Sequence, residues 1–300
     1  MKIIFNADDF GITDAVSASI VELFKAGTPL KSATVMINLL SGSSAEMLKE
    51  FLRGDRGGDV SIGLHFNLTC SKPVSPAAEI PSIVGPDLNF LKFGDLIGRA
   101  CDKKIDLSHV AREFEAQMNA FHAKLGFWPS HIDSHKHVHM LPDFFHVVED
   151  SVKKFETKRI RLTENISAEE LFTSQGIARD KITKCFGGNI DNKSAICSYG
   201  SKTALAYPDL FFGTYSVGSL SAEVFEKEIS GLENFQGVGE YMTHPGACDE
   251  KLAGLSSLLA PREAEFAALK DPALERILKK HNIEAVSYKA LDDRKKSAVK

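Results

Sequence analysis

The stretch Ile3–Gly11 reads IIFNADDFG, and its order of residue types decides the class of fold that we expect. Its unbroken apolar run, Ile3–Phe5, is typical of a parallel strand that is buried on both faces. Two carboxylates, Asp8 and Asp9, come soon after this run. An amphipathic helix that stops at Gly27 is expected next. A strand, a polar strand end and a helix form the unit from which α/β folds are built.

The same alternation of strand and helix continues along the chain. After Ile3–Phe5, strands are expected at 34–37, 60–68, just after Pro129, and at 159–162, 210–212, 239–243 and 285–288. Alternating strands and helices favour a parallel sheet covered by helices. We therefore predict an α/β fold of the irregular (β/α) barrel type, with a parallel sheet, as a single domain over residues 1–290. An open doubly wound sheet is the alternative, and no glycine-rich nucleotide-binding loop supports a nucleotide fold.

A few segments outside the strands carry expectations of their own. Four prolines exclude regular structure between 70 and 99, so we expect a long loop or lid there. One or two helices and a loop are expected between 165 and 207. A single helix is predicted from Pro261 to Lys280. Residues 291–300 are predicted to be a charged, solvated tail.

Bulk composition excludes several classes of protein. The net charge is -4, which gives no electrostatic reason to expect nucleic acid or an anionic membrane as a partner. The five cysteines are widely spaced and none lie in a Cys-x-x-Cys pair, so we expect neither a disulfide framework nor a structural zinc site. No apolar run is long enough for a signal peptide or a membrane span. A cytoplasmic protein is the expectation.

The densest chemistry in the chain lies in Ser130–His139, which reads SHIDSHKHVH. It holds four of the ten histidines and one carboxylate, Asp133. A solvated surface has no need for this density of imidazole, and an apolar core does not tolerate it unpaired. Neutral imidazole is the commonest metal ligand and the usual proton carrier near neutral pH. The stretch therefore predicts a metal-binding or catalytic site.

Polar residues gather after several of the predicted strands, at the edge where α/β proteins build their sites. They are Asp8 and Asp9, His65 and Asn67, the histidine cluster, and His244. Taken singly, such aspartates can cap a helix and a lone histidine is usually a packed core residue. Together, one or two carboxylates and two imidazoles predict a three-ligand metal site that activates water. A second carboxylate could take a proton from that water. Hydrolysis of an amide would also need an acid to protonate the leaving amine, and His244 is the candidate.

With these residues assembled, the chain resembles the YdjC-like carbohydrate deacetylase family, which includes the chito-oligosaccharide deacetylases. The resemblance covers essentially the whole chain, although no motif is recognised between 165 and 219. The matching pieces, in the family's order, are NADDFG at 6–11, GLHFNLT at 63–69, KP at 72–73, HIDSHKHVH at 131–139 and HP at 244–245.

The resemblance implies an irregular (β/α) barrel, usually a homodimer, that uses a divalent metal to remove the acetyl group from an N-acetylated sugar. By motif position, the implied metal ligands are Asp9, His65 and His135. Asp8 is the implied general base and His244 the implied general acid.

Further residues are implied to orient the ligands or to contact sugar hydroxyls. They are Asn67, Asp133, His137, His139 and Arg161. Lys136 stands where some relatives have a histidine. Magnesium is often assigned in the family, whereas two imidazoles and one carboxylate suit zinc, manganese, cobalt or nickel. We therefore expect one divalent ion, magnesium or zinc first, and leave its identity open.

Three other classes of function fit some of these residues. Two imidazoles and a carboxylate also occur in non-haem iron oxygenases, which usually have all-β folds. His137-Val138-His139 resembles the His-x-His of metal-dependent amidohydrolases or phosphoesterases, where that motif usually ends the first strand. A non-enzymatic sugar-binding protein is the third alternative. Trp128 and Phe90 could stack on sugar rings or simply pack, and packing is the expectation for Phe93.

Overall fold

The computed structural model describes residues 1–188, 190, 199–200 and 203–292. Most of the predicted tail at 291–300, and Cys197, lie outside the described residues. The chain forms two compact units, the first made of Met1–Gly63 with Pro208–Lys300 and the second of Leu64–Tyr207. Along the described chain, no helix combines the length and apolarity needed to cross a bilayer.

Among the described residues, the sheet has seven strands, in the order β4-β3-β2-β1-β6-β5 with β7 paired to β1. The strands are β1 Lys2–Phe10, β2 Leu30–Val35, β3 Ser61–Phe66, β4 Ile132–Ser134, β5 Leu210–Phe212, β6 Val238–Thr243 and β7 Glu284–Ala285. The pairs β1–β2, β1–β6, β1–β7, β3–β4 and β5–β6 are all parallel. The late strand β6 lies against β1, while β1 to β4 follow one another. This is the order of a barrel, so the predicted α/β fold is confirmed.

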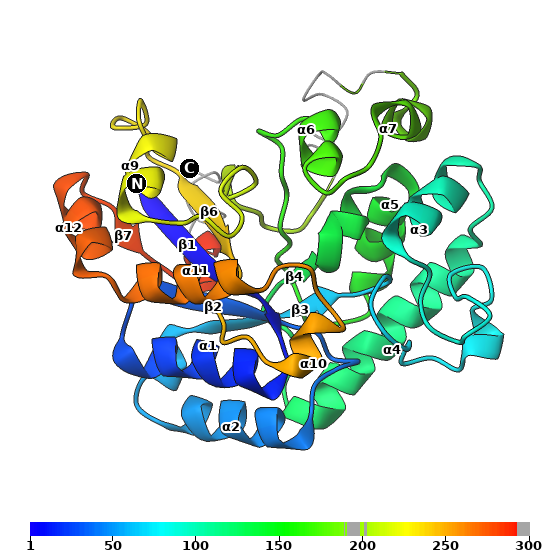
Figure 1. Cartoon of the computed structure of the whole chain (residues 1–300), viewed down its shortest axis with the longest axis horizontal. Helices are drawn as coiled ribbons and strands as arrows, with labels where there is room; N and C mark the ends of the chain where they lie inside the picture. The colour runs from blue at the N-terminus through cyan, green and yellow to red at the C-terminus, as the bar shows by residue number, and fades with distance from the viewer. Residues whose placement is uncertain (189, 191–198, 201–202, 293–300) are drawn as a thin grey trace. The chain divides into compact units, whose positions relative to one another are not determined.

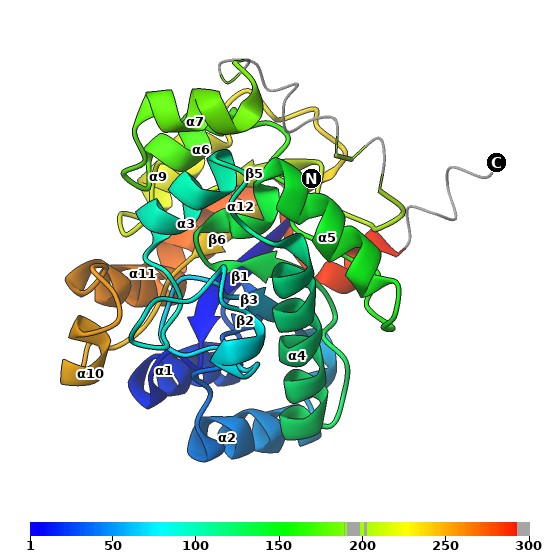
Figure 2. The same cartoon turned by 90° about the vertical axis from the view of Figure 1, so that its right-hand side faces the viewer.

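The helices follow the strands as the alternation predicted. They are α1 Asp14–Ala26, α2 Gly42–Arg53, α3 Phe93–Cys101, α4 Leu107–Leu125, α5 Pro142–Val152, α6 Ala168–Thr173, α7 Arg179–Phe186, α9 Ala222–Glu228, α10 Glu250–Ala253, α11 Ala260–Lys270 and α12 Pro272–Lys280. In the first unit, α1 and α2 lie side by side (Figure 1). In the second unit, α4 and α5 do so (Figure 2).

Helix α1 stops at Gly27, as the sequence predicted, and its two ends show why. The Thr13 side chain accepts a hydrogen bond from the Val16 backbone N–H at 3.2 Å, which caps the helix N-terminus. Gly27 ends the helix in the left-handed conformation, with φ 72°, a region that glycine adopts without steric cost. Both ends of this helix are therefore encoded locally.

Strand β1 is longer than the sequence predicted, and this moves the two aspartates. Asp8 and Asp9 lie inside β1 rather than after it. The pairing of β1 with β2 shifts register between Ala7 and Phe10, as at a β-bulge. Asp9 has a φ of 66°, in the left-handed region. A bulge re-aims side chains locally, so two neighbouring carboxylates can both lie at the strand end.

Three other expectations differ from the structure. The predicted 70–99 loop ends early, because α3 begins at Phe93, beyond the last of the four prolines. The predicted strand at 159–162 forms only isolated bridges, from Arg159 and Ile160. The predicted helix 261–280 is two helices, because Pro272 has no N–H to continue α11 and starts α12 instead.

The loop that begins after β3 is held by a buried carboxylate of α4. Both oxygens of Glu113 accept backbone hydrogen bonds, from Val74 and Ser75, each at 2.9 Å. Gln117, one turn along α4, also donates to Glu113 at 2.8 Å. Burial raises the pKa of Glu113, and these hydrogen bonds partly oppose that rise. The loop therefore has a defined path over α4.

A glycine after β5 provides a test of how tightly that strand packs on β6. Gly213 has a φ of 91°, and a Cβ there would lie 2.5 Å from the Met242 carbonyl oxygen. Gly213→Ala should therefore lower the free energy of unfolding by about 2–5 kcal/mol, from left-handed strain and backbone overlap together. Gly231→Ala is the matched control, because Gly231 has a φ of 83° with open space around it. Equal losses in denaturant unfolding of both variants would show that the contact with Met242 is unimportant.

Candidate active site

Asp8 of β1 is buried and oriented by its own strand. The Asn6 side-chain amide donates to Asp8 Oδ1 at 2.7 Å. The same amide also donates to the Thr34 hydroxyl of β2 at 3.2 Å. Asp8 is only 2% exposed. A hydrogen bond from a fixed donor holds a buried carboxylate in a defined orientation, which suits a proton acceptor.

The Asp9 carboxylate forms an ion pair with a buried arginine that is distant in sequence. Arg262 Nη2 of α11 lies 2.5 Å from Asp9 Oδ2, and both side chains are buried. Arg262 is itself held, because its Nε donates to the Leu258 carbonyl at 3.0 Å. A buried carboxylate is tolerated only when a cation or metal compensates it. The Asp9 backbone is also strained, and such strain tends to occur at functional sites.

His244 follows β6, as predicted, and its backbone is held by α11. The His244 backbone N–H donates to Glu265 Oε2. The Gly218 N–H donates to the other oxygen, Oε1, at 2.5 Å. Burial raises the pKa of Glu265 to about 7, and the two backbone N–H groups and Arg262 partly oppose the rise.

In the second unit, His65 and Asp133 form a cross-strand pair. They are register partners on β3 and β4, so their side chains lie on the same face. His65 Nδ1 lies 2.7 Å from Asp133 Oδ1. Arg161 Nη1 lies 3.0 Å from Asp133 Oδ2, with both side chains fully buried. When Nδ1–H donates to the carboxylate, Nε2 keeps the lone pair that a metal needs.

His135 lies just after β4, at the start of the short 3-10 segment His135–Met140. Its ring centroid lies 5.6 Å from that of His65, edge-on to it. Lys136 and His137 have φ values of 56° and 52°. Two successive non-glycine residues in the left-handed region are strained, and surrounding structure must hold them there. The turn lets the chain leave β4 sharply while His135 stays beside His65.

Two other histidines of the cluster, His139 and His131, are hydrogen-bonded by protein groups. His139 Nδ1 is hydrogen-bonded to the Ser134 hydroxyl, and its Nε2 lies 3.0 Å from the Arg161 carbonyl oxygen. His131 Nδ1 lies 2.8 Å from the Ser130 hydroxyl. Both nitrogens of His139 are therefore occupied, which fits a supporting role. His137 is buried in the same segment.

The Asn67 side chain shapes the turn after β3. Its Oδ1 accepts from the Thr69 and Cys70 backbone N–H groups, each at 3.0 Å, and its Nδ2 donates to the Cys70 carbonyl at 2.7 Å. The Asn67 backbone N–H donates to the Gln117 side chain at 3.1 Å. Asn67 therefore builds the start of the loop that follows His65.

The aromatic candidates for sugar stacking pack within the second unit. Trp128 stacks on His122, with ring centroids 4.3 Å apart, and also contacts Phe155. Phe93 contacts Phe172 and lies under the Lys136 ammonium, 5.1 Å from the ring centroid. Packing, the expectation for Phe93, is confirmed.

Arg262 and Glu265 were missed by sequence reasoning. Both are charged residues on a helix, where a solvent-facing position is the usual expectation. The available signal is their spacing: Arg262, Glu265 and Leu269 recur at intervals of three and four and share the buried face of α11. Charges at apolar helix positions indicate buried partners elsewhere in the fold.

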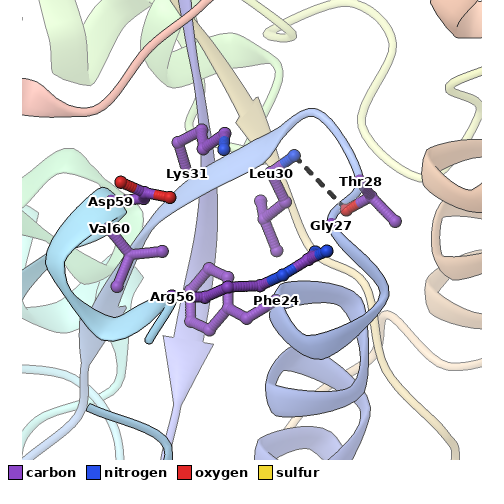
Figure 3. Close-up of a pocket in the computed structure, with 8 residues that line it drawn as sticks. All are labelled: Phe24, Gly27, Thr28, Leu30, Lys31, Arg56, Asp59 and Val60. Carbon is purple, nitrogen blue, oxygen red and sulfur yellow. Dashed lines mark hydrogen bonds between the residues drawn. The ribbon is translucent and has the colours of Figure 1, made fainter. Parts of the chain in front are cut away.

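A hollow of about 300 Å³ lies beside the first residues of β2 (Figure 3). Its lining residues are Phe24, Gly27, Thr28, Leu30, Lys31, Arg56, Asp59 and Val60. It lies where β2 begins, whereas Asp8 and Asp9 lie where β1 ends. None of the predicted site residues line it, so we do not take it as the active site.

Both units carry donors that could hold a divalent metal ion. They are Asp8 and Asp9 in the first unit, and His65, Asp133 and His135 in the second. Carboxylate oxygens and imidazole nitrogens are the donors that zinc, manganese, cobalt and nickel accept. The residue types therefore fit the predicted metal.

Comparisons with known proteins cover nearly the whole chain. Residues 2–280 match a family model described as YdjC-like protein. A carbohydrate deacetylase of Clostridium beijerinckii is 28% identical over 289 residues, covering 96% of this chain and 99% of the relative. A carbohydrate deacetylase of Geobacillus stearothermophilus is 29% identical over 286 residues, covering 95% and 96%.

One solved structure supports the fold over the same length. It is a crystal structure of a protein from Enterococcus faecalis that has been suggested to cleave cellobiose phosphate. Its TM-score with this chain is 0.76 at 24% identity, covering 97% of this chain and 98% of that one. The two proteins therefore share a fold.

Proposed function

Because this chain belongs to the YdjC-like family, we propose that it is a metal-dependent hydrolase that removes the N-acetyl group from an N-acetylated amino sugar. Relatives of nearly equal length from Clostridium beijerinckii and Geobacillus stearothermophilus are named carbohydrate deacetylases. The observation that carries the proposal is the buried pairing of His65 with Asp133, since metal-binding histidines usually donate their second N–H to such a carboxylate.

We propose Asp9, His65 and His135 as the ligands of one divalent ion. The alternative ligand set that we weigh is Asp8 with His65 and Asp133. The first set is favoured because both oxygens of Asp133 already have partners, in His65 and Arg161. When bound, a divalent ion lowers the pKa of a coordinated water and polarises a carbonyl oxygen.

The proton transfers of the proposed reaction fall to Asp8 and His244. Asp8, oriented by Asn6, accepts a proton from the attacking water. The remaining hydroxide forms a bond to the acetamide carbonyl carbon, and the carbon–nitrogen bond then breaks. The leaving nitrogen takes a proton from His244. The products are acetate and a free amino sugar.

The remaining predicted residues support this machinery. Asp133 and Arg161 fix the orientation of His65, and His139 ties the cluster to the Arg161 backbone. Asn67 holds the turn that follows β3. His137 belongs to the strained turn after His135. We propose that all five act through the ligands or through loops near the substrate.

Acetate release from N-acetylated sugars, measured with each divalent metal in turn, tests the function. Wild-type protein should release acetate in a metal-dependent way, and a chelator should abolish the release. His135→Ala should lower the activity by about 10²-fold or more through lost metal affinity. His122→Ala is the matched control, because His122 is an exposed histidine that stacks on Trp128. No acetate from chito-oligosaccharides, free amino-sugar derivatives or lipid-linked amino sugars would refute the proposed function.

Several finer statements are part of the same proposal. The ion is magnesium or zinc, the substrate is a chito-oligosaccharide or a related glycan or glycolipid, and the protein is a cytoplasmic homodimer. Metal analysis of purified protein and light scattering test the ion and the oligomeric state directly.

A further inference from the structure

We infer that Glu265 is a positioning residue for the proposed general acid, because its carboxylate fixes the segment that carries His244. The inference rests on the proposed function and adds a residue that no sequence motif indicated. Glu265 lies on α11, is 1% exposed, and has both carboxylate oxygens engaged.

The two hydrogen bonds of Glu265 join segments that follow different strands. Its Oε1 accepts from Gly218, in the loop after β5, and its Oε2 accepts from His244, directly after β6. A Cβ at Gly218 would lie 2.4 Å from Pro261 Cβ, so only glycine lets this backbone approach α11. One carboxylate therefore fixes the spacing between the two strand ends.

The segment His244–Gly246 is held by α11 at both ends. Glu265 accepts from the N–H of His244, and the Arg262 carbonyl accepts from the N–H of Gly246 at 3.1 Å. Arg262 also reaches Asp9 with its side chain. Helix α11 therefore contacts the proposed acid segment and a proposed metal ligand from one buried face.

An ionised Glu265 lowers the stability of the fold. Its pKa is raised from 4.5 to about 7, mainly by burial. Since the folded state favours the protonated form, stability is lost as the pH rises from about 4.5 through about 7. The titratable groups near this carboxylate are Arg262, Asp8, His244 and Tyr241. A neutral glutamine at this position avoids the loss, so stability and activity should respond differently to Glu265→Gln.

The experiment compares wild type, Glu265→Gln and Glu263→Gln. Glu263 is the matched control, because it is an exposed glutamate two residues away on the same helix. A glutamine can accept only one of the two backbone N–H groups with its carbonyl, since its amide is a donor. Glu265→Gln should therefore lower kcat by about 10- to 100-fold with little change in KM. Its melting temperature at pH 8 should equal or exceed that of wild type, and Glu263→Gln should match wild type in both measurements.

Each outcome decides the inference. A lower kcat at undiminished stability supports it. Unchanged kcat in Glu265→Gln overturns it, and so does a parallel loss of melting temperature and activity, which would make Glu265 a structural residue. If wild type releases no acetate at all, the proposed function fails and the inference fails with it. An active wild type beside an equally active Glu265→Gln overturns the inference alone.

Discussion

Asp8→Asn is expected to lower kcat for acetate release by about 10²–10⁴-fold, the usual contribution of a general base. Asparagine keeps an oxygen that can accept from the Asn6 amide, as Asp8 does at 2.7 Å. The neutral amide of asparagine cannot accept a proton at neutral pH. The attacking water is therefore not deprotonated by this residue. The variant should bind substrate normally and leave KM nearly unchanged.

The control for Asp8→Asn is Asp59→Asn, an exposed aspartate in the same unit. Both variants should melt within a few degrees of wild type, and only Asp8→Asn should lose activity. Steady-state kinetics and thermal unfolding measure the two effects separately. If Asp8→Asn retains full activity, the base is another residue, even where the reaction itself is right.

Arg161→Met is expected to lower the free energy of unfolding by about 3–5 kcal/mol. The Arg161 guanidinium lies 3.0 Å from Asp133, and both side chains are fully buried. Removing the cation takes away the positive charge that compensates a fully buried carboxylate. The metal affinity should fall as well, by about 10–100-fold, because Asp133 orients His65.

Arg159→Met serves as the comparison for Arg161→Met. Arg159 is only half-buried and donates to the Ser130 carbonyl at 2.9 Å. Loss of that hydrogen bond should cost about 1 kcal/mol. Urea unfolding at neutral pH measures both variants. Similar losses would mean that the buried ion pair contributes little beyond an ordinary hydrogen bond.

Local signals predicted much of the fold. The stop expected at Gly27 is the end of α1, and the strand expected at 239–243 matches β6, which comes just before His244. Such signals act over a few residues, so a single sequence carries them. The alternation of strands and helices then predicted the parallel sheet.

Features that depend on distant partners were not predictable in the same way. Pairing of His65 with Asp133 requires the register of β3 against β4, which no local pattern specifies. The bulge that keeps Asp8 and Asp9 inside β1 depends on how β1 pairs with β2. Arg262 contacts Asp9 across 253 residues of sequence. The residue types in the motifs indicated the kind of chemistry. They did not indicate which other side chains position the site residues.

That long separation also has a consequence for how the protein is made. During synthesis, Arg262 is added to the growing chain 253 residues after Asp9. At about 5–20 residues per second, the interval is roughly 13–50 s. During this time the nascent strand β1 carries its aspartate without the cation that compensates it in the finished fold. Strand β1 therefore reaches its final electrostatic environment only when α11, which follows it much later in the chain, docks.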